Sequence, residues 1–296
     1  MNDYQNKELD IFDFFKILKI NLPKIVLVTS IFILIFSFFA FFQENKYESY
    51  ALLKVTDDLD GNSSVPPSSI SNIANLAGLS IPQSSSEKKA AFGLEILNSR
   101  SFITEFIKKY DLAPMLYAVE GFDKDKIIYN KSVYVRDKNQ WKKNPPTSEE
   151  LYKIMTKMMS VEINSKTGFI TLSINHISPY VAKNIVDLLV IEINDTQRKY
   201  ELSKANKAID YLSIQSTETS LISLRSVFNS IIESQIRKKM LADISDEFYF
   251  TTIDPAFVAI KPSSPNRLLI ILFGMLLGFI ISLTYILIVA IKDSKH

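Results

Sequence analysis

The side chains that most often carry acid–base or metal chemistry are scarce in this chain, which has two histidines and no cysteine. His296 is the last residue and His176 follows a predicted strand, so they cannot form the histidine pair that binds zinc from one helix face. The lack of cysteine excludes thiol nucleophiles, thiolate metal sites and disulfides together. We interpret His176 as a polar residue at a strand end, with a catalytic role as the less favoured alternative.

Two acidic pairs, Asp57–Asp58 and Glu149–Glu150, have the residue type used in glycoside hydrolysis. That reaction needs carboxyl groups roughly 5 to 9 Å apart across the glycosidic bond, and adjacency in sequence does not establish this geometry. Adjacent acids at a helix start more often interact with the helix dipole. We therefore predict that the protein is not an enzyme and has no catalytic residue, cofactor or metal site.

Nucleotide and nucleic-acid chemistry are also not indicated. The glycines outside the apolar runs do not form a phosphate-binding motif, which argues against a fused kinase or ATPase; these glycines are Gly61, Gly78, Gly93, Gly121 and Gly168. The net charge is +2, and no basic stripe interleaved with aromatic residues is evident. We do not expect a nucleic-acid partner.

Two long apolar runs dominate the ends of the chain. Residues Ile25–Phe42 form an 18-residue run without a charge, and Leu268–Ile291 form one of 24 residues. About 20 apolar residues cross a bilayer, so we predict a transmembrane helix in each run. A buried core helix is the alternative for both, and a signal peptide for the first, although Phe39–Phe42 offers no small-residue cleavage site.

The flanking charges predict the orientation of these two helices. Four lysines precede the first run and fewer follow it closely; they are Lys7, Lys16, Lys19 and Lys24 before it, and Lys46 and Lys54 after it. An excess of basic residues marks the cytoplasmic side. We predict an inner-membrane protein with cytoplasmic tails at 1–24 and 292–296 and a periplasmic domain at 43–267.

The periplasmic domain is expected to belong to the α+β class. A strand is predicted over Tyr47–Thr56, and a second sheet segment is the β hairpin of Met159–Ser165 with Phe169–Asn175, joined through Gly168. Helical periodicity covers Lys88–Tyr110 with an interruption at which Ser99 can act as an N-cap. A further helix begins at Thr147 or Ser148, and β character returns at Glu247–Ile253.

A long helix is predicted over about residues 180–241, where the chain has neither proline nor glycine. Its apolar stripe has a heptad-like spacing typical of a coiled coil and consists of Leu202, Ala205, Ile209 and Leu212. The next seam positions fall on Ser216 and Thr219, which suit a dry interface poorly. We predict that the helix changes its packing partner or bends within Ser213–Ser220.

Two further features concern the second transmembrane helix. Gly274 and Gly278 form a small-xxx-small pattern that allows two helix backbones to approach closely. Pro262 and Pro265 lie just before the helix and predict an extended, non-helical connector.

The order of these elements resembles the polysaccharide co-polymerases, which are the chain-length determinant proteins of bacterial surface glycan assembly. The segments that carry the resemblance are 75–79 (NLAGL), 94–102 (LEILNSRSF), 166–168 (KTG), 173–179 (SINHISP), 253–256 (IDPA) and 262–267 (PSSPNR). Together they extend over most of the chain.

The resemblance implies a membrane-proximal α/β base with a long helical extension. It also implies a ring of identical chains that sets the length of a lipid-linked glycan made by a separate polymerase in the same membrane. Only residues 292–296 follow the second span and no tyrosine-rich tail is present, which favours the kinase-free kind associated with O-antigen or related polymers. The alternatives are a two-span periplasmic sensor or ligand-binding protein and, less favoured, a periplasmic enzyme acting on glycan.

Overall fold

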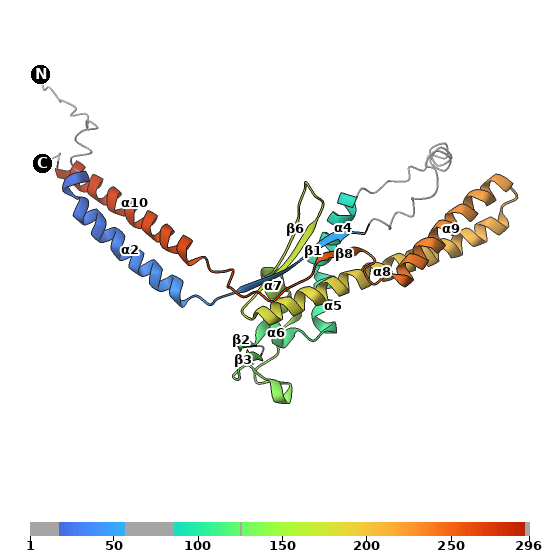
Figure 1. The fold of residues 1–296 in the computed structure, drawn as a ribbon, viewed down its shortest axis with the longest axis horizontal. Helices are drawn as coiled ribbons and strands as arrows, with labels where there is room; N and C mark the ends of the chain where they lie inside the picture. The colour runs from blue at the N-terminus through green and yellow to red at the C-terminus, as the bar shows by residue number, and fades with distance from the viewer. Residues whose placement is uncertain (1–17, 57–85, 125, 294–296) are drawn as a thin grey trace, which may run out of the picture. The chain divides into compact units, whose positions relative to one another are not determined.

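The computed structural model describes residues 18–56, 86–124 and 126–293. The chain divides into two compact units (Figure 1). One is built from the chain up to Lys46 and from Pro262 onward, and the other from Tyr47–Lys261. We call them the membrane unit and the large unit. The acids Asp57 and Asp58 and the segment 75–79 lie outside the described residues.

The membrane unit is a pair of helices that lie side by side, α2 (Leu22–Phe42) and α10 (Arg267–Asp293). Each is long and apolar enough to cross a membrane, and each contains the corresponding predicted span. Beyond the helices the two chain segments meet at Lys46, whose backbone N–H donates to the Ser264 carbonyl at 2.8 Å.

The large unit contains a four-stranded antiparallel sheet in the order β6-β7-β1-β8. Its strands are β1 (Tyr47–Val55), β6 (Met159–Ile163), β7 (Ile170–His176) and β8 (Phe250–Asp254). The predicted hairpin is confirmed, because β6 pairs with β7 from Met159 opposite Ile174 to Ile163 opposite Ile170. Gly168 has a φ of +71°, the left-handed conformation that glycine adopts without steric strain.

Two helices, α4 (Ser86–Asn98) and α7 (Ser148–Met158), pack against this sheet, and α5 (Arg100–Lys109) packs against both of them. The predicted N-cap of α5 is confirmed, since the Ser99 hydroxyl accepts from the Phe102 N–H at 3.3 Å. At α7, Thr147 and Glu150 form a capping box, in which each side chain binds the other residue's backbone N–H. The core residues include Leu53, Phe106, Met155, Leu172 and Phe250, all fully buried.

Between α5 and α7 the chain forms a small excursion that the sequence did not predict. It contains the short helix α6 (Ala113–Tyr117) and two two-stranded ribbons. The ribbons consist of β2 (Val119–Asp123) with β3 (Lys126–Tyr129), and of β4 (Tyr134–Val135) with β5 (Gln140–Trp141). The 3₁₀ turn η2 (Arg136–Lys138) joins the last two strands.

The predicted long helix does not run unbroken over about 180–241, since the chain leaves the helical conformation at Thr219, within the interval Ser213–Ser220 where a bend or a change of packing partner was predicted. The two resulting helices, α8 (Pro179–Glu218) and α9 (Ile222–Ile244), form a helical hairpin, with α9 folded back along α8 (Figure 1). The 40 residues of α8 span roughly 60 Å at 1.5 Å per residue. Thr219 has an extended backbone, with φ −78° and ψ 132°, and this ends α8.

The turn of the hairpin is closed by Arg225. Its Nε donates to the Ser216 carbonyl at 3.1 Å, and its guanidinium also donates to the Thr219 carbonyl at 2.8 Å. The last carbonyls of a helix have no partner within the helix, so a cation at this end satisfies and stabilises them. The polar interval therefore marks a reversal of the chain, from which α9 returns along α8.

Candidate functional site

His176, the strongest candidate for acid–base chemistry, is a buried structural residue. Its Nδ1 accepts from the Ser178 backbone N–H at 3.0 Å, and its Nε2 lies 3.0 Å from the Met115 carbonyl. Because Nδ1 is an acceptor, we assign the ring proton to Nε2, which donates to Met115. Both ring nitrogens thus join the end of β7 to backbone groups, including one of α6. These hydrogen bonds indicate a structural role for His176.

The acidic pair Glu149–Glu150 lies in the first turn of α7. Glu150 belongs to the capping box of α7, and the hydrogen bond from the Thr147 backbone lowers the pKa of its carboxyl. Glu149 lies 3.0 Å from Lys153 and 3.7 Å from Arg100, and chiefly the Lys153 contact lowers its pKa. Both carboxylates are exposed and charged, as solvated helix-start acids usually are.

Metal chemistry has no visible site in the part of the chain that the structure describes. There, no three side chains of histidine, aspartate or glutamate gather in a way that could hold an ion.

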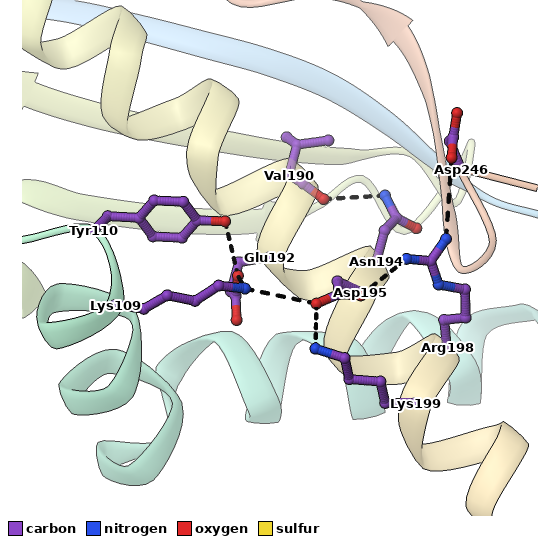
Figure 2. A network of polar contacts seen from close by, with 9 residues as sticks. All are labelled: Lys109, Tyr110, Val190, Glu192, Asn194, Asp195, Arg198, Lys199 and Asp246. Atoms are coloured by element: carbon purple, nitrogen blue, oxygen red, sulfur yellow. Dashed lines mark hydrogen bonds and ion pairs between the residues drawn. The ribbon is translucent and has the colours of Figure 1, made fainter.

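A polar network connects the end of α5 to the middle of α8 (Figure 2). The Lys109 ammonium lies 2.5 Å from Glu192, and the Tyr110 hydroxyl donates to the same carboxylate at 2.9 Å. The hydrogen bond that Lys109 donates to Glu192 raises the pKa of Lys109, while burial and the same carboxylate raise the pKa of Tyr110. A charged hydrogen bond of this kind orients the two helices relative to each other.

Asp195 extends the network along α8. Its carboxylate lies 2.7 Å from Lys199, 2.9 Å from Arg198 and 3.6 Å from Lys109. Partial burial works to raise the pKa of this carboxyl, but the hydrogen bonds from Lys199 and Arg198 outweigh it and lower the pKa. The Arg198 guanidinium also lies 4.0 Å from the carboxylate of Asp246, which is just beyond the end of α9. The network thus reaches both arms of the hairpin near its base.

Beside this network, Asn194 fastens the hairpin to the sheet. Its side chain is buried, and its carboxamide oxygen accepts from the backbone N–H groups of Tyr249 and Phe250, each at 2.8 Å. Its amide nitrogen donates to the carbonyls of Val190 and Phe250, each at 3.1 Å. We call these contacts the Asn194 joint. Sequence reasoning missed it, because a single asparagine in a long helix gives no signal of distant backbone partners.

A close approach of α4 completes the joint. A Cβ atom at Gly93 would lie 2.4 Å from Phe250 Cζ, so only glycine leaves room for this ring. The Tyr249 hydroxyl donates to the Lys89 carbonyl at 2.7 Å, and burial raises the pKa of Tyr249 to about 12. The base of the hairpin is therefore tied to α4, to α5 and to β8.

The glycines predicted for helix packing lie on the face of α10 that meets α2. A Cβ at Gly274 would lie 2.5 Å from Phe36 Cγ, and one at Gly278 would lie 2.8 Å from Phe32 Cβ and 3.1 Å from Thr29 Cα. These neighbours belong to the same chain. Both glycines thus permit the close approach of α10 to α2 within one chain.

The remaining predicted residues lie in two different places. Pro262 and Pro265 flank Ser263 and Ser264, whose backbone groups pair with Lys46 ahead of α10. Ser216 and Thr219 lie at the turn of the α8–α9 hairpin, where the buried Ser216 hydroxyl contacts Asn229 Oδ1 at 3.1 Å. The proline pair and the glycine pair thus belong to the membrane unit, and the pair Ser216 and Thr219 belongs to the large unit.

Residues 7–110 match the family model described as Wzz, chain length determinant protein. This part of the chain is similar to chain length determinant proteins. The resemblance found in the sequence is thereby confirmed for this stretch, which includes the α4–Ser99–α5 segment. No curated protein sequence matches the chain.

Solved structures of polysaccharide co-polymerases are among the similar folds. One, described as a full-length bacterial polysaccharide co-polymerase, is 12% identical with a TM-score of 0.38, and the alignment covers 96% of this chain and 99% of that chain. Another is a fragment of WzzB, a polysaccharide co-polymerase from Salmonella Typhimurium. It is 10% identical with a TM-score of 0.27, and the alignment covers 74% of this chain and 100% of that chain.

Proposed function

We propose that this protein is a non-catalytic regulator of the chain length of a surface polysaccharide, acting as an oligomeric scaffold for a separate polymerase. The observation that carries the proposal is the match of residues 7–110 to the chain length determinant family. The glycan would be O-antigen or a related lipid-linked polymer. Both chain ends would be cytoplasmic and the large unit periplasmic, which is the orientation that the lysines before the first helix favour.

The side chains that could carry catalysis support a non-catalytic role. His176 uses both ring nitrogens on backbone groups, and the Glu149–Glu150 pair serves the start of α7. Neither arrangement leaves a general acid or base facing a substrate. A regulator that acts through its surface does not need one.

An exposed apolar stripe on α9 supports assembly into an oligomer. Ile236, Met240 and Ile244 follow one another at a spacing of four residues, so they lie along one face of the helix. Their exposed fractions are 43%, 62% and 80%. Large aliphatic side chains aligned in this way mark contact surfaces, and we propose that neighbouring copies of the chain cover them.

Deleting the gene in the source bacterium and separating its surface polysaccharide by gel electrophoresis tests the proposal. We expect polymer to persist with a broadened length distribution, because the polymerase remains while its regulator is absent. Complementation with the intact gene is the control and should restore the original distribution. Complete loss of polymer, or an unchanged distribution, would contradict chain-length control.

A further inference from the structure

The small excursion between α5 and α7 carries a cluster of four aromatic rings, which we call the aromatic cluster. It consists of Tyr117, Tyr129, Tyr134 and Trp141, drawn from α6, β3, β4 and β5. The ring centroids lie 6.2 Å apart for Tyr117 and Trp141, 5.0 Å for Tyr134 and Trp141, and 5.6 Å for Tyr129 and Tyr134. None of the four rings belongs to the main hydrophobic core.

The inner part of the aromatic cluster is held in place by local contacts. Tyr134 is buried, pairs with Trp141 across the β4–β5 ribbon, and donates its hydroxyl to Asn139 Oδ1. Asn139 has a φ of +47°, a left-handed conformation that asparagine tolerates better than most residues. The Arg136 guanidinium lies 5.5 Å from the centre of the Tyr129 ring. The ring positions are therefore preorganised.

The outer part of the aromatic cluster faces solvent. The side chain of Tyr117 is 46% exposed, and that of Trp141 is partly exposed. A ring that served only to fill a small core would gain more by burial than by such exposure. Tyrosine and tryptophan also lose little conformational entropy on binding, because each has only two side-chain torsions. The pair Tyr117–Trp141 thus offers a rigid surface for a ligand.

The surroundings of this surface are basic. The segment 131–143 contains five basic residues and one acidic residue. Three of the basic side chains, Lys138, Lys142 and Lys143, are exposed and have no acidic partner within 4.0 Å among the residues that the structure describes. A ligand that carries negative charge would therefore gain favourable electrostatic energy here.

We propose that the aromatic cluster and its three lysines form a binding site for an acidic saccharide segment. The apolar C–H face of a sugar ring would pack on Tyr117 and Trp141, whose ring faces carry partial negative charge. Lysine ammonium groups would pair with the carboxylate or other anionic substituent of the sugar. The inference deepens the proposed function, since the source of this saccharide would be the polysaccharide whose length the protein controls.

The ring geometry distinguishes a saccharide from single-stranded nucleic acid. Successive bases stack on aromatic faces along a groove that follows the backbone. Here the Tyr117 and Trp141 rings are inclined at 65°, and the Tyr134 and Trp141 rings at 55°. Inclined rings present one face and one edge, an arrangement that suits a single compact sugar ring better than a stack of flat bases.

Trp141 makes the test direct, because it is the only tryptophan in the chain. The full-length protein in mild detergent is titrated with a hexamer of galacturonic acid while tryptophan emission is recorded. We expect a saturable change in emission that added salt weakens, and at least tenfold weaker binding of the neutral hexamer maltohexaose. Equal binding of the two hexamers, or no saturable change with the acidic one, would overturn the proposal.

Substitutions at exposed positions test which residues bind the acidic hexamer, and each variant retains Trp141 as the reporter. Tyr117→Ala should weaken binding of the acidic hexamer roughly tenfold, the effect of losing one aromatic contact, and the double change Lys142→Glu with Lys143→Glu should weaken it about tenfold or more, because it replaces two cations with two anions. The matched controls, Tyr200→Ala and Lys207→Glu, change exposed residues of α8 and should leave binding unchanged. Thermal melting of each variant reports whether it is folded. Equal losses in the site and control variants would overturn the assignment.

Further titrations separate this inference from other ligands and from the proposed function. Tighter binding of a single-stranded DNA hexamer, or of anionic phospholipid vesicles, would overturn the saccharide assignment. Altered polysaccharide length after gene deletion with no binding of the acidic hexamer would leave the proposed function standing and refute this site. Specific binding with an unchanged length distribution would support the site and contradict length control.

Discussion

Asn194 forms two hydrogen bonds with the backbone of Phe250: its carboxamide oxygen accepts from the Phe250 N–H at 2.8 Å, and its amide nitrogen donates to the Phe250 carbonyl at 3.1 Å. The two residues are 56 positions apart, on α8 and β8. The side chain thus acts as a short piece of β-strand backbone for the first residue of β8. It also places the base of the α8–α9 hairpin against the sheet.

Replacing Asn194 with leucine should destabilise the large unit. The change leaves the buried N–H groups of Tyr249 and Phe250 without their acceptor, and each such group costs about 1–3 kcal/mol. We expect a fall of roughly 3 kcal/mol or more in the free energy of unfolding, measured by denaturant titration. Asn184→Leu, at an exposed position of the same helix, is the control and should have little effect. Equal stability of the two variants would show that the Asn194 joint is dispensable.

Gly93→Ala should also weaken the base of the hairpin. The new methyl group would lie 2.4 Å from Phe250 Cζ and 2.9 Å from Tyr249 Cε1, so the rings or α4 must shift. Overpacking of this kind typically costs about 1–3 kcal/mol. Gly121→Ala is a matched control, because a Cβ at Gly121 has no neighbour within 4 Å. Thermal unfolding should show a lowered melting temperature for Gly93→Ala alone, and an unchanged value would contradict the close packing.

Gly274→Leu should weaken the packing of α10 on α2, since even a Cβ there would lie 2.5 Å from Phe36 Cγ. We expect a lower melting temperature in mild detergent. Adding Phe36→Ala should recover part of the loss, because it removes the ring that the leucine meets. A double-mutant cycle measures this recovery. Leu276→Ala, at an exposed position of α10, is the control, and strictly additive effects of Gly274→Leu and Phe36→Ala would refute the contact.

The hairpin predicts specific crosslinks within one chain. Ser216 contacts Asn229, and Asn206 contacts Lys239, through side chains at 3.1 Å in both cases. Cysteines placed at either pair should react with a short bifunctional reagent to give an intrachain crosslink, and the absence of native cysteine removes background. Cysteines at Ser216 and Lys239 should fail to react in this way. Crosslinks only between chains would contradict the hairpin.

Tyr249 should make the large unit sensitive to alkaline pH. Its pKa is raised to about 12 in the folded protein by burial, whereas an unfolded tyrosine has a pKa near 10. The stabilisation from the raised pKa is complete below pH 10 and is lost as the pH rises towards 12. Unfolding measured between about pH 9 and 12 should show a steeper loss of stability for the native protein than for Tyr249→Phe. Parallel pH profiles would contradict the burial of this hydroxyl.

The sequence alone determined those features that depend on neighbouring residues. The two apolar runs predict α2 and α10 because about 20 such residues suffice to cross a bilayer. Ser99 and Thr147 predict helix starts because an N-cap acts within three residues, and Gly168 predicts a hairpin because a tight turn is local. The resemblance to chain length determinant proteins likewise rests on short segments that keep their order along the chain.

Only the tertiary structure decided the features that join distant segments. Composition without glycine or proline favoured one long helix, but α9 returns along α8, and of the predicted α8 stripe Ala205 is buried in the hairpin. The partners of Asn194 lie 56 positions away, and the aromatic cluster draws its rings from four separate elements. Such contacts depend on which surfaces meet after folding, and a local pattern contains no information about them.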